Sequence, residues 1–179
     1  MNSVQVSADF EGGKSYKLVK YFWNAYSGLA GELKNDSKKY TEYEFFITGH
    51  SLGGALASIW AMDFVLSGIV ASDNIVKYTY GEPRVGNTDW AQDFDKYVPH
   101  AYRVVHDGDM VSHLPPPVFL QWTYEHTSTE IWYNDEFSSY RVCLPNEDPN
   151  CSNETTVLKL NMDDHLYYWN IRIGDSCSN

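Results

Sequence analysis

Apolar residues recur with helical spacing in three parts of the chain. Between residues 14 and 33 the large apolar side chains return every three or four positions, which predicts an amphipathic helix over 14–33. Polar residues from Asn35 onward end this pattern. The same spacing predicts a second helix over 51–66 and a shorter third helix over 89–97.

Short apolar runs lie between and after these helices. They predict strands over 43–48, 74–80 and 101–105, and a late hairpin or pair of edge strands over 130–133 and 140–143. Strands that alternate with helices predict an α/β domain with a largely parallel sheet. The 179 residues show no repeat, no low-complexity tract and no linker, so we expect a single domain over 1–179.

The formal charge of the chain restricts its partners. Lys and Arg number 13, Asp and Glu number 24, and the net charge is −11. Such a surface repels phosphate backbones and anionic membranes, which argues against nucleic acid as a partner but not against neutral oil or zwitterionic lipid. No apolar run approaches the roughly eighteen residues of a transmembrane helix, so we expect no transmembrane segment.

The three cysteines are Cys143, Cys151 and Cys177. An odd number allows at most one intramolecular disulfide and leaves one thiol over. Cys143 and Cys151 flank a polar loop that a disulfide would close into a small ring. Two unrelated cysteines in a reduced protein would give the same spacing, so the pattern by itself leaves both interpretations open.

Two glycosylation sequons begin at Asn35 and Asn153, and a poorer one begins at Asn150. They are weak signals of secretion, because sequons often arise by chance. The first residues of the chain lack the apolar run of a signal peptide. The signals for the cellular compartment therefore conflict.

The segment Gly49-His50-Ser51-Leu52-Gly53 lies directly after a predicted strand and directly before a predicted helix. A nucleophilic serine needs such a tight turn to expose its hydroxyl, and the crowded backbone requires flanking residues without side chains, which Gly49 and Gly53 provide. The N–H of Leu52, at the start of the helix, is the expected oxyanion donor. The small residues that follow let the helix lie close to the sheet. The alternative is a glycine-rich packing turn.

A serine nucleophile needs a base and an acid that orients the base. In hydrolases with this turn the order along the chain is Ser, acid, His. Asp107 and Asp109 both follow the predicted strand over 101–105, and His165 is the histidine that lies well after them. Either aspartate would also suit a solvated turn. An alternative interpretation is a set of metal ligands made up of His106, Asp107, Asp109 and His113. The spacing of these residues matches no common zinc or calcium pattern.

Four segments, in this order, resemble the motifs of the class 3 lipases, a family that includes secreted fungal triacylglycerol lipases and related animal sequences. The resemblance runs from about residue 14 to residue 173. It covers the family's nucleophile elbow, its second signature loop, its acid loop and the segment that carries its base, at 46–55, 80–87, 103–116 and 164–168.

This resemblance implies an α/β-hydrolase-like fold and a serine ester hydrolase of the triacylglycerol lipase type. Asp109 matches the family's catalytic aspartate, which decides between it and Asp107, and His165 matches the base that serves Ser51. The implied substrate is a lipid or another ester at a lipid–water interface, with no metal and no cofactor. The resemblance also implies secretion and a late disulfide at the positions of Cys143 and Cys151.

The resemblance fails at the N-terminus. In the family, several strands, a helical lid and a Ser or Thr oxyanion donor precede the segments seen here, so we expect an N-terminally incomplete chain. Cys177 lies where the family's C-terminus is tied to an N-terminal cysteine, and that partner is missing. An incomplete oxyanion site favours a weak hydrolase or a non-catalytic lipid-binding protein as the alternative function.

Other ester substrates, such as feruloyl esters or phospholipids, are a further alternative. The aromatic-rich stretch over 119–124 is either a wall of the substrate site or ordinary core.

Overall fold

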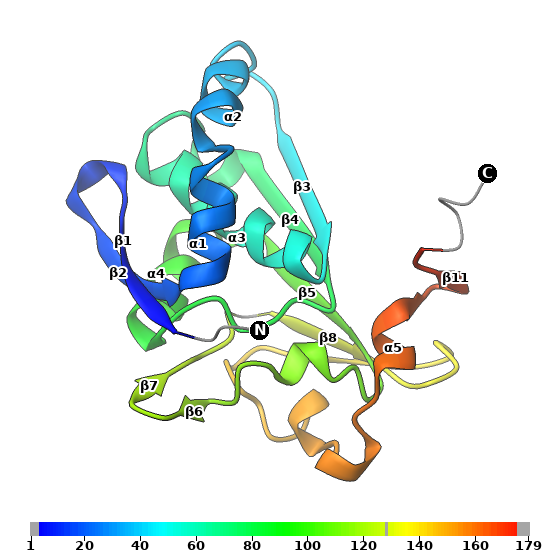
Figure 1. The fold of residues 1–179 in the computed structure, drawn as a ribbon. Helices are drawn as coiled ribbons and strands as arrows, with labels where there is room; N and C mark the ends of the chain where they lie inside the picture. Colours follow the sequence, from blue (N-terminus) through cyan, green and yellow to red (C-terminus); the bar gives the residue numbers. More distant parts are fainter. Residues whose placement is uncertain (1–3, 128, 175–179) are drawn as a thin grey trace.

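A five-stranded sheet forms the centre of the computed structural model, which describes residues 4–127 and 129–174 (Figure 1). Its strand order is β3-β4-β5-β8-β9, and their bounds are Phe45–His50, Ile75–Tyr80, Ala101–His106, Glu130–Tyr133 and Tyr140–Cys143. The first four strands are parallel, and β9 pairs antiparallel with β8. The predicted α/β class, the mostly parallel sheet and the late hairpin are confirmed.

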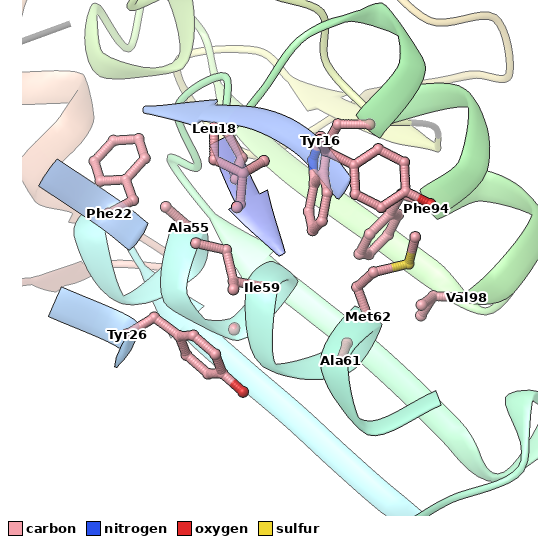
Figure 2. Packing of buried hydrophobic residues seen from close by; sticks show 14 of the residues in the cluster. Tyr16, Leu18, Phe22, Tyr26, Ala55, Ile59, Ala61, Met62, Phe94 and Val98 are labelled. Atoms are coloured by element: carbon pink, nitrogen blue, oxygen red, sulfur yellow. The ribbon is translucent and has the colours of Figure 1, made fainter. Parts of the chain in front are cut away.

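Helices and a hairpin build the main core against one face of this sheet. The helices are α1 (Lys20–Ser27), α2 (Ala30–Ser37), α3 (Leu52–Leu66) and α4 (Thr88–Tyr97), and the hairpin pairs β1 (Gln5–Asp9) with β2 (Ser15–Val19). Apolar side chains from these elements meet in one buried cluster, which includes Tyr16, Leu18, Phe22, Tyr26, Ala55, Ile59, Met62 and Phe94 (Figure 2). The cluster fixes α3, and with it the turn that precedes α3, on the sheet.

The predicted helix over 14–33 is wrong in its first part. Residues Ser15–Val19 form β2, in which Tyr16 and Leu18 are buried while Ser15 and Lys17 are exposed. This alternation has the period of a strand, and pairing with β1 satisfies the backbone. The helix begins only at Lys20 and ends at Ser27, and α2 follows as a separate helix.

Shorter elements make up the rest of the secondary structure in the described ranges. They are the strand pairs β6 (Val118–Phe119) with β7 (Trp122–Thr123) and β10 (Tyr167–Tyr168) with β11 (Ile171–Arg172), the helix α5 (Met162–Leu166), and five 3₁₀ turns at Glu11–Gly13, Ser72–Asn74, Val111–His113, Ser152–Glu154 and Val157–Lys159. Within the described ranges, every helix is too short or too polar to cross a membrane.

Candidate active site

Three neighbouring parallel strands end at the same edge of the sheet and carry the residues of the candidate site. Ser51 follows β3, Gly81 follows β4, and Asp109 lies in the loop after β5. The fourth contribution comes from α5, which holds His165. Carboxyl ends of parallel strands are the usual place for a ligand in an α/β sheet, because the loops that leave them converge there.

Ser51 occupies the strained turn that the sequence predicts. Its φ is 56°, a left-handed conformation that side chains rarely adopt, and α3 begins at the next residue. A Cβ atom on Gly49 would lie 2.2 Å from the carbonyl oxygen of Gly53, so only glycine fits there. The expectation for Gly53 itself is wrong, because a Cβ on this exposed residue meets no atom within 4 Å. The second crowded position is Gly54, whose Cβ would lie 3.2 Å from the Cβ of Glu82.

Hydrogen bonds join Ser51, His165 and Asp109 into one continuous chain. The Nε2 atom of His165 lies 2.8 Å from the Oγ of Ser51, and its Nδ1 atom lies 2.9 Å from the Oδ1 of Asp109. The Asp109 side chain is fully buried and His165 is 3% exposed. This geometry holds the imidazole with one nitrogen toward the hydroxyl and the other toward the carboxylate, which is the arrangement that activates a serine.

The carboxylate of Asp109 has further donors. The N–H of Val111 donates to Oδ1 at 2.8 Å, and the hydroxyl of Tyr168 donates to Oδ2 at 2.7 Å. Burial by itself raises the pKa of Asp109, but the hydrogen bond and charge of His165, with these two donors, lower it overall. Burial and the nearby Asp109 charge raise the pKa of Tyr168 well above its usual value, so its hydroxyl stays a donor. The sequence patterns did not predict a role for Tyr168, although its place three residues after His165 was a usable signal.

Asp107, the rival acid, has charged neighbours other than His165. The hydrogen bonds of His165 go to Asp109, and the backbone carbonyl of Asp107 accepts a bond from the indole N–H of Trp132. Burial, together with the charges of Asp164 and Asp135, raises the pKa of the Asp107 carboxyl. The geometry therefore favours Asp109 as the partner of the histidine.

Gly81 is a second residue whose role in the site was not predicted from the sequence. Its φ is +58°, and a Cβ there would lie 2.5 Å from the Oδ2 of Asp109 and 2.8 Å from the Nδ1 of His165. The aspartate and histidine therefore have room to meet only because residue 81 lacks a side chain.

A second histidine, His50, lies beside His165 and makes a structural contact with it. His50 lies with its ring 4.5 Å from that of His165, and its Nε2 is 2.8 Å from the carbonyl oxygen of His165. Burial lowers the pKa of His50, which favours a neutral ring that donates this bond. His50 therefore fixes the backbone that carries the candidate base.

The alternative metal set is not brought together. Among the described residues, the group of possible ligands around His106 is completed by Asp135 and Asp164 instead of Asp107, Asp109 and His113. Both ring nitrogens of His106 lie at hydrogen-bond distance from backbone carbonyl oxygens, at 3.1 and 3.0 Å. Neither nitrogen is free to bind a metal ion in this arrangement.

The N–H of Leu52 is the candidate oxyanion donor. Leu52 is the first residue of α3, so its N–H has no carbonyl partner within the helix and lies at the positive end of the helix dipole. The candidate donor is thus adjacent in sequence to Ser51.

A disulfide joins Cys143 and Cys151, as the resemblance implies. Cys177 lies outside the described residues. Asn35 is exposed on α2, whereas Asn153 is half-buried and its side-chain amide donates to Glu147. Of the two sequons, the one at Asn35 is the more accessible to an attached glycan.

Two apolar cavities flank the candidate site. One of about 490 Å³ lies beside the acid loop and is lined in part by Met110, Leu114, Pro116, Val157 and Leu160. Another of about 270 Å³ is lined by His50, Tyr80, Tyr168, Trp169, Ile171 and Ile173. The aromatic stretch over 119–124 lines neither of these two cavities, and its Tyr124 belongs to the buried apolar cluster.

Comparisons with known proteins identify similar sequences that are named as lipases. The sequence model of a family described as lipase (class 3) matches residues 1–119. Lipase ZK262.3 of Caenorhabditis elegans is 36% identical over 170 residues, which cover 76% of this chain and 47% of that protein. The lipase of Rhizomucor miehei is 35% identical over 170 residues, which cover 88% of this chain and 44% of that protein. The chain spans about half the length of the curated relatives it matches.

The fold also matches solved lipase structures. A triacylglycerol lipase described as having a serine protease triad at its catalytic centre superimposes with a TM-score of 0.82 and 31% identity. That match covers 96% of this chain and 66% of the other chain. Fungal relatives of the chain include proteins named as secreted mono- and diacylglycerol lipases, from Fusarium solani and Malassezia globosa.

Proposed function

The chain belongs to the class 3 lipase family, and we propose that it hydrolyses lipid esters by acyl transfer through Ser51, His165 and Asp109. The observation that carries this proposal is the unbroken hydrogen-bonded chain from the Oγ of Ser51 to the Asp109 carboxylate. The related lipase whose catalytic centre is described as a serine protease triad supports it. The same unbroken chain weighs against a non-catalytic lipid-binding protein.

The first half of the reaction forms an acyl-enzyme. The Nε2 atom of His165 accepts the Ser51 proton while the Oγ atom bonds to the ester carbonyl carbon. The carbonyl oxygen becomes an oxyanion, and the N–H of Leu52 donates to it. When the tetrahedral intermediate collapses, the ester C–O bond breaks and the alcohol leaves with the proton from His165. Asp109 stabilises the imidazolium throughout and stays ionised, consistent with its lowered pKa.

The second half releases the fatty acid. Water replaces the alcohol, His165 accepts one of its protons, and the water oxygen attacks the acyl carbon. Collapse of this second intermediate breaks the bond to Ser51 and returns the proton to its Oγ.

A lipid ester is the proposed substrate class. The apolar lining of the cavity beside the acid loop suits an acyl chain, and the net charge of −11 favours a neutral or zwitterionic lipid surface. We further propose that the protein is secreted, because the Cys143–Cys151 disulfide needs an oxidising compartment and fungal relatives are named as secreted.

Labelling with a fluorophosphonate, followed by peptide mapping, tests the nucleophile directly. We expect the probe to modify Ser51, and Ser51→Ala to lose labelling together with at least about 10⁴-fold of the hydrolysis of p-nitrophenyl esters. Ser27→Ala is the matched control, since Ser27 is an exposed helical serine of α1. Labelling of another serine, or full activity of Ser51→Ala, would refute the proposal.

A further inference from the structure

Arg84 is a buried cation that holds the loop carrying Asp109. It lies in the turn between β4 and α4 and is 1% exposed. We define the acid loop as residues 107–116. The Nη1 atom of Arg84 donates to the carbonyl oxygens of His113 and Pro115, at 2.9 and 3.0 Å. The backbone N–H of Arg84 donates to the carbonyl oxygen of Leu114 at 2.8 Å. Three successive residues of the acid loop are thus fixed by one arginine.

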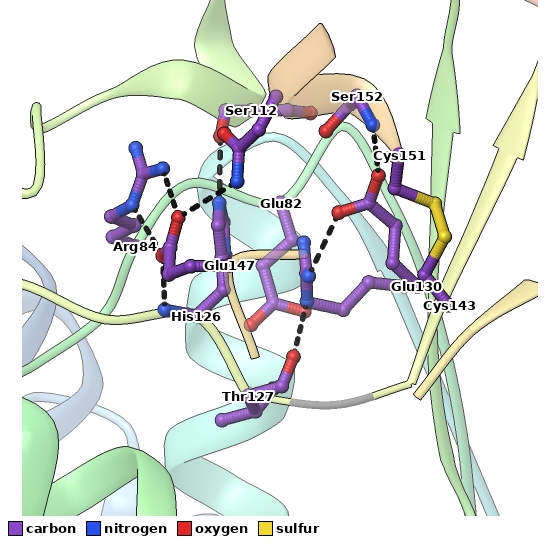
Figure 3. Close-up of polar contacts among 12 residues, drawn as sticks. Glu82, Arg84, Ser112, His126, Thr127, Glu130, Cys143, Glu147, Cys151 and Ser152 are labelled. Carbon is purple, nitrogen blue, oxygen red and sulfur yellow. Dashed lines mark hydrogen bonds and ion pairs between the residues drawn. A yellow bond between two sulfur atoms is a disulfide. The ribbon is translucent and has the colours of Figure 1, made fainter. Parts of the chain in front are cut away.

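The charge of Arg84 is balanced by Glu147, which comes from a distant part of the sequence (Figure 3). The Nε and Nη2 atoms of Arg84 donate to the two carboxylate oxygens of Glu147 at 2.7 and 2.6 Å. Such a two-point contact is the strongest geometry for this pair. Glu147 lies in the loop closed by the Cys143–Cys151 disulfide, which we call the cystine loop.

The Glu147 carboxylate is saturated with donors. Besides Arg84, the backbone N–H of His126 donates to it at 2.8 Å and the side chain of Asn153 at 3.1 Å. Burial opposes ionisation, but the hydrogen bonds and positive charge of Arg84, with the contribution of His126, hold the pKa of Glu147 well below its usual value. His126 also contacts the acid loop, with its Nε2 2.7 Å from the carbonyl oxygen of Ser112.

The residues held by Arg84 are continuous with those that orient Asp109. The 3₁₀ turn Val111–His113 joins them, and the N–H of Val111 donates to the Oδ1 of Asp109. A displacement of His113 and Pro115 therefore moves the donor that aims the carboxylate at His165. We propose that Arg84 and Glu147 are positioning residues for Asp109, with the cystine loop holding Glu147 in place; this inference rests on the proposed role of Asp109.

Removing the Glu147 charge has a definite consequence. An uncompensated guanidinium is costly in a buried place, so Arg84 must turn toward water and release the carbonyl groups of His113 and Pro115. A glutamine at 147 accepts only one of the two bonds, and its NH₂ group faces the guanidinium. Glu147→Asp keeps the charge but shortens the side chain, so we expect a weaker form of the same effect.

The chain offers a matched control. Arg103 and Glu130 form a second buried pair at 3.1 Å, and Glu130 likewise accepts a backbone N–H, from Ser152. This pair joins β5 to β8, and the side chain of Arg103 donates to Thr127 and Glu130, which lie outside the acid loop. Glu130→Gln thus removes a comparable buried charge and leaves the hydrogen bonds from Arg84 to that loop in place.

The experiment compares the wild type with Glu147→Gln, Glu147→Asp and Glu130→Gln. The readouts are thermal melting, the pH dependence of ester hydrolysis and of fluorophosphonate labelling, and the NMR signal of the proton between His165 and Asp109. We expect Glu147→Gln to lose about 10- to 100-fold in kcat with little change in KM, because small misplacements of catalytic groups cost this much. The acidic limb of its profile should move to lower pH, since a displaced Asp109 stabilises the imidazolium less, and the NMR signal should shift or broaden.

Glu130→Gln should melt earlier but keep the wild-type kcat, profile and NMR signal. Unchanged kcat, pH profile and NMR signal in Glu147→Gln, or equal changes in Glu130→Gln, would overturn the positioning role. If Glu147→Gln does not fold, Glu147→Asp decides, and wild-type behaviour of that variant overturns the proposal. A wild type that hydrolyses no ester refutes the proposed function instead, and the NMR comparison still decides the positioning role.

Discussion

Substituting Gly81 by alanine places a methyl group against the Asp109–His165 pair. The new Cβ would lie 2.5 Å from the Oδ2 of Asp109, whereas ordinary contacts begin at 3.4 Å. One or both groups must then move by roughly 0.9 Å in total, and a misplacement of that size costs on the order of 100-fold in rate. Overpacking and the positive φ of this residue together destabilise the fold by about 2–4 kcal/mol.

Gly68→Ala separates the two effects. Gly68 has a φ of +68°, close to that of Gly81, but a Cβ there meets no atom within 4 Å. It should therefore cost about 1–2 kcal/mol of stability through backbone strain and leave the rate unchanged. Ester hydrolysis and urea unfolding of both variants give the comparison. A Gly81→Ala variant with the wild-type rate, or equal rate losses in both, would show that the crowding does not control the catalytic pair.

Asp109→Asn should lower kcat by about 10⁴-fold and Asp107→Asn by less than tenfold, measured on p-nitrophenyl esters; the reverse order would identify Asp107 as the acid. Tyr168→Phe should destabilise the protein by about 1.5–3 kcal/mol in urea unfolding, because it removes a donor to a buried carboxylate, and an unchanged midpoint would contradict this. The pKa values of Asp109 and Glu147 are lower in the folded protein than in the unfolded chain, so both carboxylates stabilise the fold at pH values above their unfolded-state pKa values. The free energy of unfolding should therefore fall as the pH drops below about 4.5. Glu147→Gln should make this dependence of the unfolding free energy on pH less steep, and a dependence equal to that of the wild type would refute the contribution of Glu147.

Local sequence patterns determined much of the fold. The apolar run before Gly49 and the helical spacing after Ser51 predicted β3, the turn and α3, because strand and helix periods are properties of neighbouring residues. The alternation of such segments predicted the mostly parallel sheet. The order of the chemistry-bearing residues, with the family resemblance, selected Ser51, Asp109 and His165, which the structure brings into contact.

Other features depended on which residues the fold places together. The hairpin strand β2 replaced the first part of a predicted helix because its partner β1 and its packing against α4 lie outside any local window. The hydrogen bond of Tyr168 and the tight space at Gly81 both involve residues separated from Asp109 by tens of positions in the sequence. The Arg84–Glu147 pair spans a sequence separation of 63. Periodicity predicts the face of a helix or strand on which a side chain lies. Only tertiary packing decides which distant side chain it contacts there, and the geometry of this candidate site depends on such long-range contacts.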